Sequence, residues 1–214
     1  MRLIAINGSP RERGNTSILI GKLFEELNDV DIETREINVG SKHFRGCVAC
    51  GGCWKNKNKK CIIKSDELND IIEELLEADA IVLGSPVYCA DVSGQMKTFI
   101  DRVSMVACAN DDMLKRKLGA SITAVRRAGS LPALNTMNSF FTILQMPIIS
   151  SSYWNMGFGY EEGDVLKDAE GIQTMKTLGK NLSYFLRLIE AGKSQVKEPD
   201  TITETLTNFI REDL

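Results

Sequence analysis

The fold of this chain is decided by residues 2–17, which read RLIAINGSPRERGNTS. They combine a short apolar segment typical of a strand, a polar loop rich in turn-forming residues, and a segment that begins as a helix. A loop that opens onto a helix N-terminus presents free backbone amides and the positive end of the helix dipole, and both attract anions. We therefore interpret this loop as a phosphate-binding loop.

The residue types of the loop suit a phosphate. Gly8 and Gly14 allow close approach of the backbone, Arg11 can pair bidentately with phosphate oxygens, and Asn15 is a typical helix N-cap. Further hydroxyl donors are Ser9, Thr16 and Ser17. The alternative interpretation is an ordinary polar loop between a strand and a helix.

Two better-known phosphate loops do not match. The segment lacks the Gly-Lys-Ser/Thr ending of a P-loop, and its glycines are not spaced as in the dinucleotide fingerprint. The pattern therefore favours a monophosphate ligand over a nucleoside triphosphate or a classical NAD site.

Composition limits the class of protein. With 214 residues, 43% hydrophobic and 26% charged, the chain is long enough for one sizeable α/β core. A net charge of -3 argues against a nucleic-acid partner, because such proteins usually carry a basic excess. No apolar run approaches the length of a membrane span and no export signal is recognisable, so we expect a cytoplasmic protein without a membrane partner.

The hydrophobic pattern predicts alternating strands and helices. After the first strand, further strands are expected at 31–39, 80–83, 119–125 and 146–150. Helices are expected at 15–28, 66–76 with Asp66 as the cap, 93–106, 131–144 and 168–191. This alternation predicts an α/β fold with a doubly wound five-stranded parallel sheet, helices on both faces, flavodoxin-like strand order, and ligand sites at the carboxyl ends of the strands.

The chain is expected to form one domain over residues 1–192, with a cysteine-bearing insert at 44–64 and a tail at 193–214. Within the tail, residues 200–213 carry Thr201 and Glu204 at the spacing of a capping box, followed by an amphipathic pattern. We expect a short helix there that packs on its own domain or on a neighbouring subunit.

The insert carries four cysteines in a ligand-like pattern. Cys47, Cys50 and Cys53 are separated by two residues each, and Cys61 follows eight residues later. One tight turn can present three such thiolates to a cubane cluster, as in the bacterial ferredoxin run. A [4Fe–4S] cluster fits this spacing better than zinc, whose structural sites generally use two separate knuckles. Zinc and metal-free thiols remain alternatives.

Three other residues near these patterns are given simpler interpretations. Cys108 is expected in the core. Cys89 lies beside the loop that follows the third strand, and the sequence assigns it no reactivity. The lone His43 has no recognisable triad partner and is interpreted as a surface residue.

Three motifs in order resemble the iron-sulfur flavoproteins, which are relatives of the NAD(P)H-dependent FMN reductases. They are GSPRERGNTS after the first strand, CVACGGCWKNKNKKC between the second strand and second helix, and GSPVYCADVSGQMKTFIDR after the third strand. The resemblance implies that the FMN phosphate is bound by Ser9, Arg11, Asn15, Thr16 and Ser17. It implies that the isoalloxazine ring lies against Pro86, Val87, Tyr88, Cys89 and Ala90.

Two further loops match that family less well. Relatives often have a glycine-rich turn after the fourth strand, whereas residues 124–130 read AVRRAGS. Arg126 and Arg127 can meet an anionic cofactor or a nicotinamide nucleotide phosphate, or form a solvated basic turn. Tyr153, Trp154 and Asn155 resemble a cover over the flavin, with an ordinary loop as the alternative.

The resemblance implies an FMN-dependent oxidoreductase that transfers electrons between a [4Fe–4S] cluster and FMN to a small acceptor. NAD(P)H or ferredoxin is the expected donor, and a homodimer or homotetramer is the expected assembly. The cofactors carry the chemistry in such proteins, so no side chain is assigned as a general acid or base. The alternatives are a cluster-free NAD(P)H-dependent FMN or quinone reductase, and a non-enzymatic flavodoxin-like electron carrier or zinc-bearing binding module.

Overall fold

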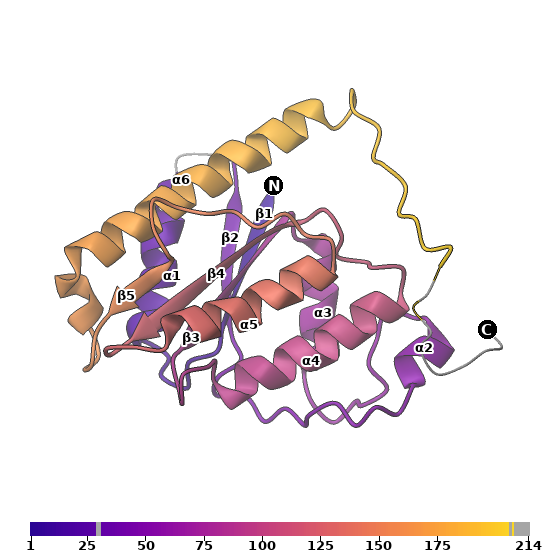
Figure 1. Ribbon diagram of the computed structural model, residues 1–214, viewed down its shortest axis with the longest axis horizontal. Coiled ribbons are helices and arrows are strands. Elements are labelled where there is room, and N and C mark those ends of the chain that lie inside the picture. Colours follow the sequence, from indigo (N-terminus) through magenta and orange to yellow (C-terminus); the bar gives the residue numbers. More distant parts are fainter. Residues whose placement is uncertain (29–30, 206, 208–214) are drawn as a thin grey trace.

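A five-stranded parallel sheet forms the centre of the protein (Figure 1). The structure is a computed structural model that describes residues 1–28, 31–205 and 207. The strands are β1 (Arg2–Asn7), β2 (Glu33–Asn38), β3 (Ala80–Pro86), β4 (Leu118–Val125) and β5 (Met156–Phe158). Their order, β2-β1-β3-β4-β5 with all neighbours parallel, confirms the predicted flavodoxin-like sheet.

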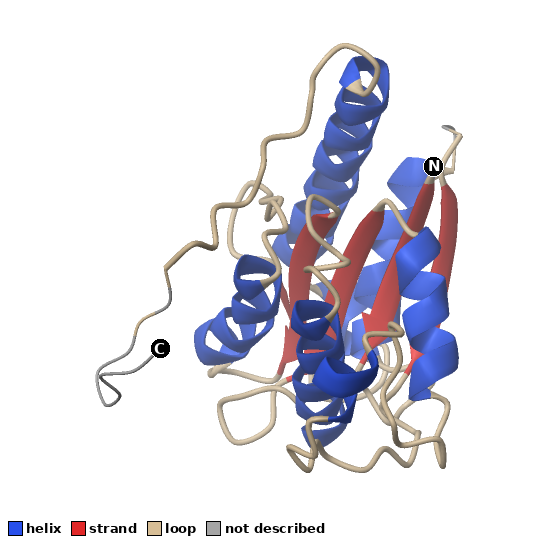
Figure 2. Ribbon diagram, turned by 90° about the vertical axis from the view of Figure 1, so that its right-hand side faces the viewer, coloured by secondary structure: helices blue, strands red, loops and turns tan. Residues whose placement is uncertain are grey.

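Helices cover both faces of this sheet, as Figure 2 shows. They are α1 (Asn15–Phe24), α2 (Gly52–Asn56), α3 (Leu68–Glu77), α4 (Gly94–Ala109), α5 (Ser130–Ile143) and α6 (Ala169–Gly192). Two 3-10 turns, Glu25–Leu27 and Asp164–Lys167, follow α1 and precede α6. Helices α1 and α6 pack on one face, and α3, α4 and α5 on the other.

The sheet separates two hydrophobic cores because successive side chains of a strand point to opposite faces. In β1, Leu3 and Ala5 belong to the core under α1 and α6, whereas Ile4 and Ile6 belong to the core under the other three helices. All four side chains are completely buried. A strand that is apolar on both faces is what a fully covered parallel sheet requires.

The predicted position of the fifth strand is wrong. Residues 146–150 make one isolated bridge with the start of β4, between Gly119 and Ile148. The strand that pairs with the end of β4 is β5, ten residues later, where Thr123 lies opposite Met156. Pro147 has no amide proton, so the apolar run around it cannot continue a ladder of hydrogen bonds.

The helix ends also differ from the sequence expectation in detail. Gly14, rather than Asn15, is the N-cap of α1, and Glu67, rather than Asp66, is the N-cap of α3. Asp66 still accepts a hydrogen bond from the amide of Leu68 at 3.3 Å. The Asn15 side chain bonds to the segment after β5 instead, and the other carboxylate oxygen of Asp66 accepts from Arg102.

The predicted tail helix is absent from residues 200–205, which have no regular secondary structure. The rest of that prediction, at residues 206 and 208–214, lies outside the described residues. Within the described part of the tail, Glu198 pairs with Arg116 at 3.1 Å.

Membrane-spanning helices are not found among the residues that the structure describes, because no helix there combines sufficient length with sufficient hydropathy.

Gly40 lies directly against the first loop. Its amide donates a hydrogen bond to the carbonyl oxygen of Asn7 at 3.1 Å. A Cβ at this position would overlap the backbone carbonyl group of Ser9, which cannot move without displacing the loop. By contrast, a Cβ at Gly21 in α1 would meet nothing within 4 Å.

We therefore expect Gly40→Ala to lower the free energy of unfolding by about 1–3 kcal/mol through overpacking against the backbone. Gly21→Ala is the matched control and should raise it by up to about 1 kcal/mol, because alanine favours a helix over glycine. Urea unfolding followed by circular dichroism measures both. Equal stability of the Gly40→Ala variant and the parent would contradict the packing described here.

Candidate functional site

The first loop, residues 8–14, is fastened to β2 by a polar network. The side chain of Asn7, at the buried end of β1, accepts a hydrogen bond from the amide of Ser9 at 2.8 Å and donates to Glu36 at 2.7 Å. The second carboxylate oxygen of Glu36 accepts from the Ser17 hydroxyl at 2.9 Å. Asn38 donates to the carbonyl oxygen of Ser9 at 2.9 Å. These bonds connect the start of the loop and the first turn of α1 to one neighbouring strand.

The other side of the loop is fastened to α4. The N-cap of α4 is Ser93, whose hydroxyl donates to the carbonyl oxygen of Gly8 at 2.7 Å and accepts from the amide of Met96 at 3.2 Å. The amide of Gly8 donates to the carbonyl oxygen of Gly84 in β3 at 2.8 Å. The loop is therefore held between two elements before any ligand arrives, which favours precise binding.

The N-terminus of α1 is open to an anion. Its N-cap, Gly14, makes no side-chain capping bond, and the first turn contains no acidic residue. The first amides of a helix have no acceptor within the helix, and the helix dipole is positive at this end. Thr16 is buried beside these amides, while Arg11 is exposed at the rim. This arrangement suits a phosphate group.

A pocket of about 210 Å³, which we call the loop pocket, lies between the first loop and the segment that follows β3. It brings together seven of the ten residues predicted to contact a flavin: Ser9, Arg11, Asn15, Thr16, Pro86, Val87 and Tyr88. The polar members come from the first loop and α1, and the apolar members come from the carboxyl end of β3. One end of the pocket is therefore suited to an anion and the other to a flat apolar group.

The other three predicted residues do not line the loop pocket. Ser17 points to Glu36. Cys89 and Ala90 form the exposed tip of a two-residue turn, with positive φ angles of 48° and 59°. Tyr88 and Asp91 close this turn by exchanging backbone hydrogen bonds of 2.8 and 3.0 Å, as in a type I′ turn.

Four residues complete the lining of the loop pocket: Ala124, Arg126, Gly159 and Tyr160. Arg126 is one of the two arginines whose charge suits an anionic cofactor, and its guanidinium lies 4.6 Å from the centre of the Tyr160 ring in a cation–π contact. Gly159 and Tyr160 were missed, because the strand that carries them to the site was placed ten residues too early. The signal that would find them is a Gly-Tyr pair directly after a correctly placed β5.

Asn15 joins the first loop to the segment after β5 instead of capping α1. Its side-chain oxygen accepts from the amides of Gly163 at 3.0 Å and Val165 at 3.4 Å, and its amide group donates to the carbonyl oxygen of Glu161 at 3.0 Å. A Cβ at Gly159 would lie only 2.7 Å from the Asn15 side chain. A small residue is therefore needed there.

The residues compared with a flavin cover lie elsewhere. Tyr153 and Trp154 pack edge to face, with ring centres 4.7 Å apart, and both are more than half exposed. Asn155 is buried, and its side chain accepts a hydrogen bond from Ser151 at 2.6 Å. None of the three is among the residues that line the loop pocket.

The cysteine insert forms a second, smaller cavity beside α4, which we call the cysteine cavity. All four predicted ligands line it: Cys47, Cys50, Cys53 and Cys61. A left-handed residue, Gly51 with φ of 68°, reverses the chain before the short helix α2. Close packing of Gly52 against Ile62 brings the segment with the first three cysteines next to the segment with Cys61. The spacing of the cysteines in the sequence therefore corresponds to a shared location in the fold.

All six cysteines are free thiols, and four soft donors around one cavity match a [4Fe–4S] cluster in kind and number. Among the described residues, no group of three or more His, Cys, Asp and Glu side chains has the geometry to hold a metal ion. The donor set thus fits a cluster, although the sulfur positions are not those of a closed site.

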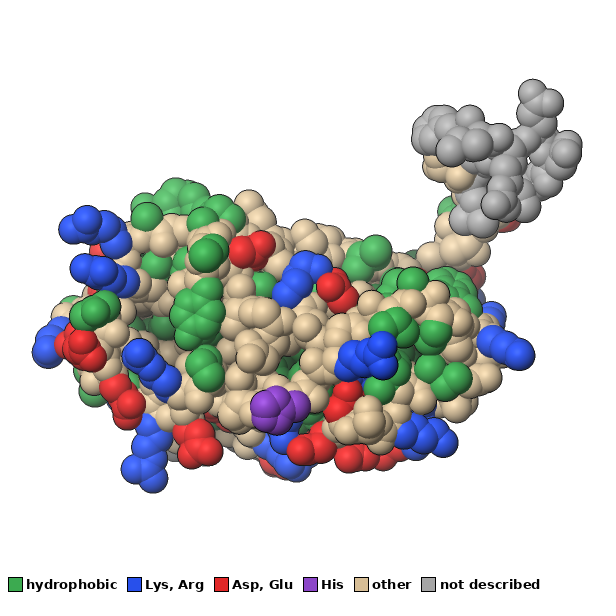
Figure 3. Space-filling model, turned by 90° about the horizontal axis from the view of Figure 1, so that it is seen from below, with side chains coloured by type: hydrophobic (Ala, Val, Ile, Leu, Met, Phe, Trp, Pro, Cys, Tyr) green, Lys and Arg blue, Asp and Glu red, His purple; other side chains and the backbone are tan. Residues whose placement is uncertain are grey.

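Cys108 and His43 lie where the sequence suggested. Cys108 is half-buried against the core, and this burial, together with neighbouring Asp112, raises the pKa of its thiol. A thiol with a raised pKa is a poor nucleophile and metal ligand at neutral pH. His43 is exposed and forms the purple patch in Figure 3.

Comparisons with known proteins agree with this geometry. The family model described as NADPH-dependent FMN reductase matches residues 1–161. Two iron-sulfur flavoproteins of Methanocaldococcus jannaschii are 32% and 31% identical to the chain, which they match over 89% of its length and over 100% and 98% of their own. An iron-sulfur flavoprotein of Methanosarcina thermophila is 27% identical over 91% of this chain and 100% of that protein.

Solved structures agree in fold. RosB with a bound riboflavin-phosphate intermediate superposes with a TM-score of 0.70 at 15% identity, over 98% of this chain and 93% of that chain. A flavodoxin-like WrbA-like protein of Agrobacterium tumefaciens gives a TM-score of 0.59 at 16% identity, over 87% and 97% of the two chains. At these identities the likeness establishes the flavodoxin-like fold.

If the first loop binds the FMN phosphate, the double substitution of Arg11 and Thr16 by alanine should weaken FMN binding by roughly a hundredfold to ten-thousandfold. Each hydrogen bond to a charged group contributes about 1.5–3 kcal/mol, and the loss of one such bond from each residue sets this range. Quenching of flavin fluorescence measures the dissociation constant. Arg13→Ala is the matched control, because Arg13 is an exposed arginine of the same loop that does not line the loop pocket. Unchanged affinity in the folded double variant would remove this assignment.

Proposed function

This chain belongs to the family of NADPH-dependent FMN reductases, and we propose that it works as an iron-sulfur flavoprotein in which electrons pass between a [4Fe–4S] cluster and FMN to a small acceptor. The family makes the protein an FMN-dependent oxidoreductase. The observation that carries the finer proposal is that one cavity is lined by all four cysteines of the insert.

The loop pocket supports the assignment of residues to the flavin. FMN, when bound, supplies the redox chemistry, and the chain supplies binding and orientation. We assign the phosphate to Arg11, Thr16 and the open N-terminus of α1, and the ring to the apolar side of the pocket. The amides of Val87 and Tyr88 already donate to Ala124 and Asp91 at 3.1 and 2.8 Å, so packing rather than hydrogen bonding is the contribution of this segment.

The cysteine cavity supports the cluster. Its donors are four thiols, and several relatives in the same family carry the name iron-sulfur flavoprotein. The second candidate is a cluster-free NAD(P)H-dependent FMN or quinone reductase. It is favoured because no group of three or more His, Cys, Asp and Glu side chains among the described residues has the geometry to hold a metal ion. For either candidate we propose NAD(P)H or ferredoxin as the electron donor.

The two cavities are separated along α4. Ser93, at the start of this helix, bonds to the first loop, whereas Arg102 lines the cysteine cavity. The eight steps along the helix from Gly94 to Arg102 correspond to roughly 12 Å at 1.5 Å per residue. In Figure 1, α2 accordingly lies beside the C-terminal half of α4. Electron exchange is efficient only at short range, so we propose that the insert of one copy approaches the flavin of another in a homodimer or homotetramer.

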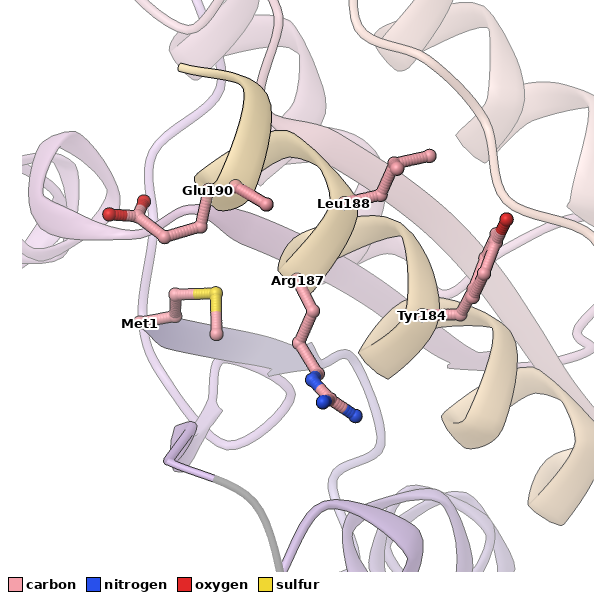
Figure 4. Close-up of a pocket in the computed structure, with 6 residues that line it drawn as sticks. Met1, Tyr184, Arg187, Leu188 and Glu190 are labelled. Atoms are coloured by element: carbon pink, nitrogen blue, oxygen red, sulfur yellow. The ribbon is translucent and has the colours of Figure 1, made fainter. Parts of the chain in front are cut away.

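The outer side of α6 offers a surface for such a contact between copies. Four large side chains near its end are substantially exposed: Tyr184, Phe185, Leu188 and Ile189. Figure 4 shows Tyr184, Leu188 and Arg187 projecting from the helix, with Met1 beside it. Contiguous exposed apolar side chains of this kind mark contact surfaces in soluble proteins.

We expect the substitution of serine for any one of Cys47, Cys50, Cys53 or Cys61 to lower the iron and acid-labile sulfide content while FMN stays bound. The flavin contacts lie in other loops, so they should not respond. The matched control is Cys108→Ser, which should change neither cofactor because Cys108 packs against the core. Assays follow anaerobic reconstitution. Less than roughly one iron per parent chain would favour the cluster-free reductase.

We expect light scattering to give a mass of two or four chains of 23.7 kDa at working concentration. Leu188→Asp should shift the distribution to lighter species, because it places a charge in the apolar surface of α6. A single monomeric species of the parent protein would rule out the proposed assembly.

A further inference from the structure

Arg102 is a cation buried in the apolar face of α4. Its exposed fraction is 1%, and its neighbours on the helix, Phe99, Val103 and Val106, are buried core residues. Removing a guanidinium group from water is costly unless it is paired and hydrogen-bonded. A buried arginine in this position therefore requires specific partners.

Those partners lie in the cysteine insert or directly after it. One terminal nitrogen, Nη1, pairs with the buried carboxylate of Asp66 at 2.5 Å and donates to the carbonyl oxygen of Arg45 at 3.2 Å. The other, Nη2, donates to the sulfur atom of Cys61 at 3.3 Å. Nε is buried without a partner among the described residues.

The two terminal nitrogens of Arg102 have different acceptors. Arginine and a carboxylate often pair through two parallel hydrogen bonds. Here only Nη1 bonds to Asp66, and Nη2 bonds to the sulfur atom instead. The Cys61 sulfur atom is thus the hydrogen-bond acceptor for one terminal nitrogen of the buried Arg102.

Cys61 is held in place for this contact. Its amide donates to the side-chain oxygen of Asn69 at 2.8 Å, and its carbonyl oxygen accepts from the Asn69 amide group at 3.0 Å. The amide of Lys59 donates to the side chain of the buried Asn110, the C-cap of α4, at 2.9 Å. The segment that carries Cys61 is therefore fixed to α3 and α4, and both Cys61 and Arg102 line the cysteine cavity.

We propose that Arg102 raises the reduction potential of the cluster held by the insert, by donating a hydrogen bond to the Cys61 sulfur and placing a buried positive charge beside it; this inference rests on the proposed function. Reduction of the cluster would add one electron, delivered by ferredoxin or by the reduced flavin, and the cluster itself would break no bond and take up no proton. A nearby cation and hydrogen bonds to the sulfur atoms stabilise the more negative reduced form. Arg102 is then a positioning residue for electron transfer.

The test compares Arg102→Met with Lys97→Met in the reconstituted full-length protein. Both substitutions remove one positive charge from α4, but Lys97 is exposed and pairs with Asp101 at 2.5 Å. The midpoint potential is measured by redox titration followed by electron paramagnetic resonance. We expect Arg102→Met to make reduction at least tenfold less favourable, which is about 59 mV for one electron. Lys97→Met should leave the potential unchanged.

Two further variants keep the test decisive if Arg102→Met does not fold. Asp66→Asn removes the carboxylate that offsets Arg102, so the potential should shift upward. Arg102→Lys retains the charge but loses the planar fork, so the potential should fall by less than in the methionine variant. Unchanged potentials in both would overturn the proposal.

Failure of the proposal is distinguishable from failure of the proposed function. A parent protein with less than roughly one iron per chain would overturn both, because there would be no cluster to respond. A parent with a full cluster, and variants with lower thermal stability but the same potential, would overturn only the role of Arg102. The residue would then serve solely to fasten the insert to α4.

Discussion

The polar groups at the end of β1 must be satisfied from outside the sheet, and the site depends on how this is done. Asn7 is completely buried there, yet its side chain and backbone hold the first loop, β2 and Gly40 in fixed positions. Ser93 satisfies the next carbonyl, that of Gly8, from α4. With these groups paired inside the protein, the amides of the first turn of α1 are the ones left for a ligand. The same requirement, that buried polar groups be hydrogen-bonded, therefore fixes the scaffold and leaves the α1 amides available at the candidate anion site.

The alternation of strands and helices and the polar loop after β1 could be predicted because they follow from patterns within single segments, whereas the pocket residues after β3 came from the resemblance to the iron-sulfur flavoproteins. The buried run at β3 and the polar loop after β1 are visible one segment at a time. The fifth strand was misplaced because an apolar run predicts burial and does not specify pairing. Met146 and Ile149 are indeed buried, but β5 is only three residues long and has one buried position, Gly157. Because the fifth strand was misplaced, Gly159 and Tyr160 were not predicted as residues of the loop pocket.

The cysteine cavity illustrates the same limit. The spacing of four cysteines along the insert was enough to predict that they share a location. It could not identify Arg102, because an arginine in a helix is ordinarily expected at the surface. Its burial depends on Asp66, which lies 36 positions earlier in the chain and was interpreted as a helix cap. Contacts of this kind join side chains from distant segments, and they leave no periodic pattern in the sequence of either segment.

Asn15 gives the site a dependence on the order of synthesis. Its bonds reach Glu161, Gly163 and Val165, up to 150 positions later in the chain. A nascent chain that has left the ribosome only as far as α5 already contains all four cysteines of the insert and four of the five strands. It still lacks the segment to which the Asn15 side chain bonds at the start of α1. The N-terminal end of α1 is therefore encoded early in the chain, but its contacts with the segment after β5 can form only when the final quarter of the protein is emerging.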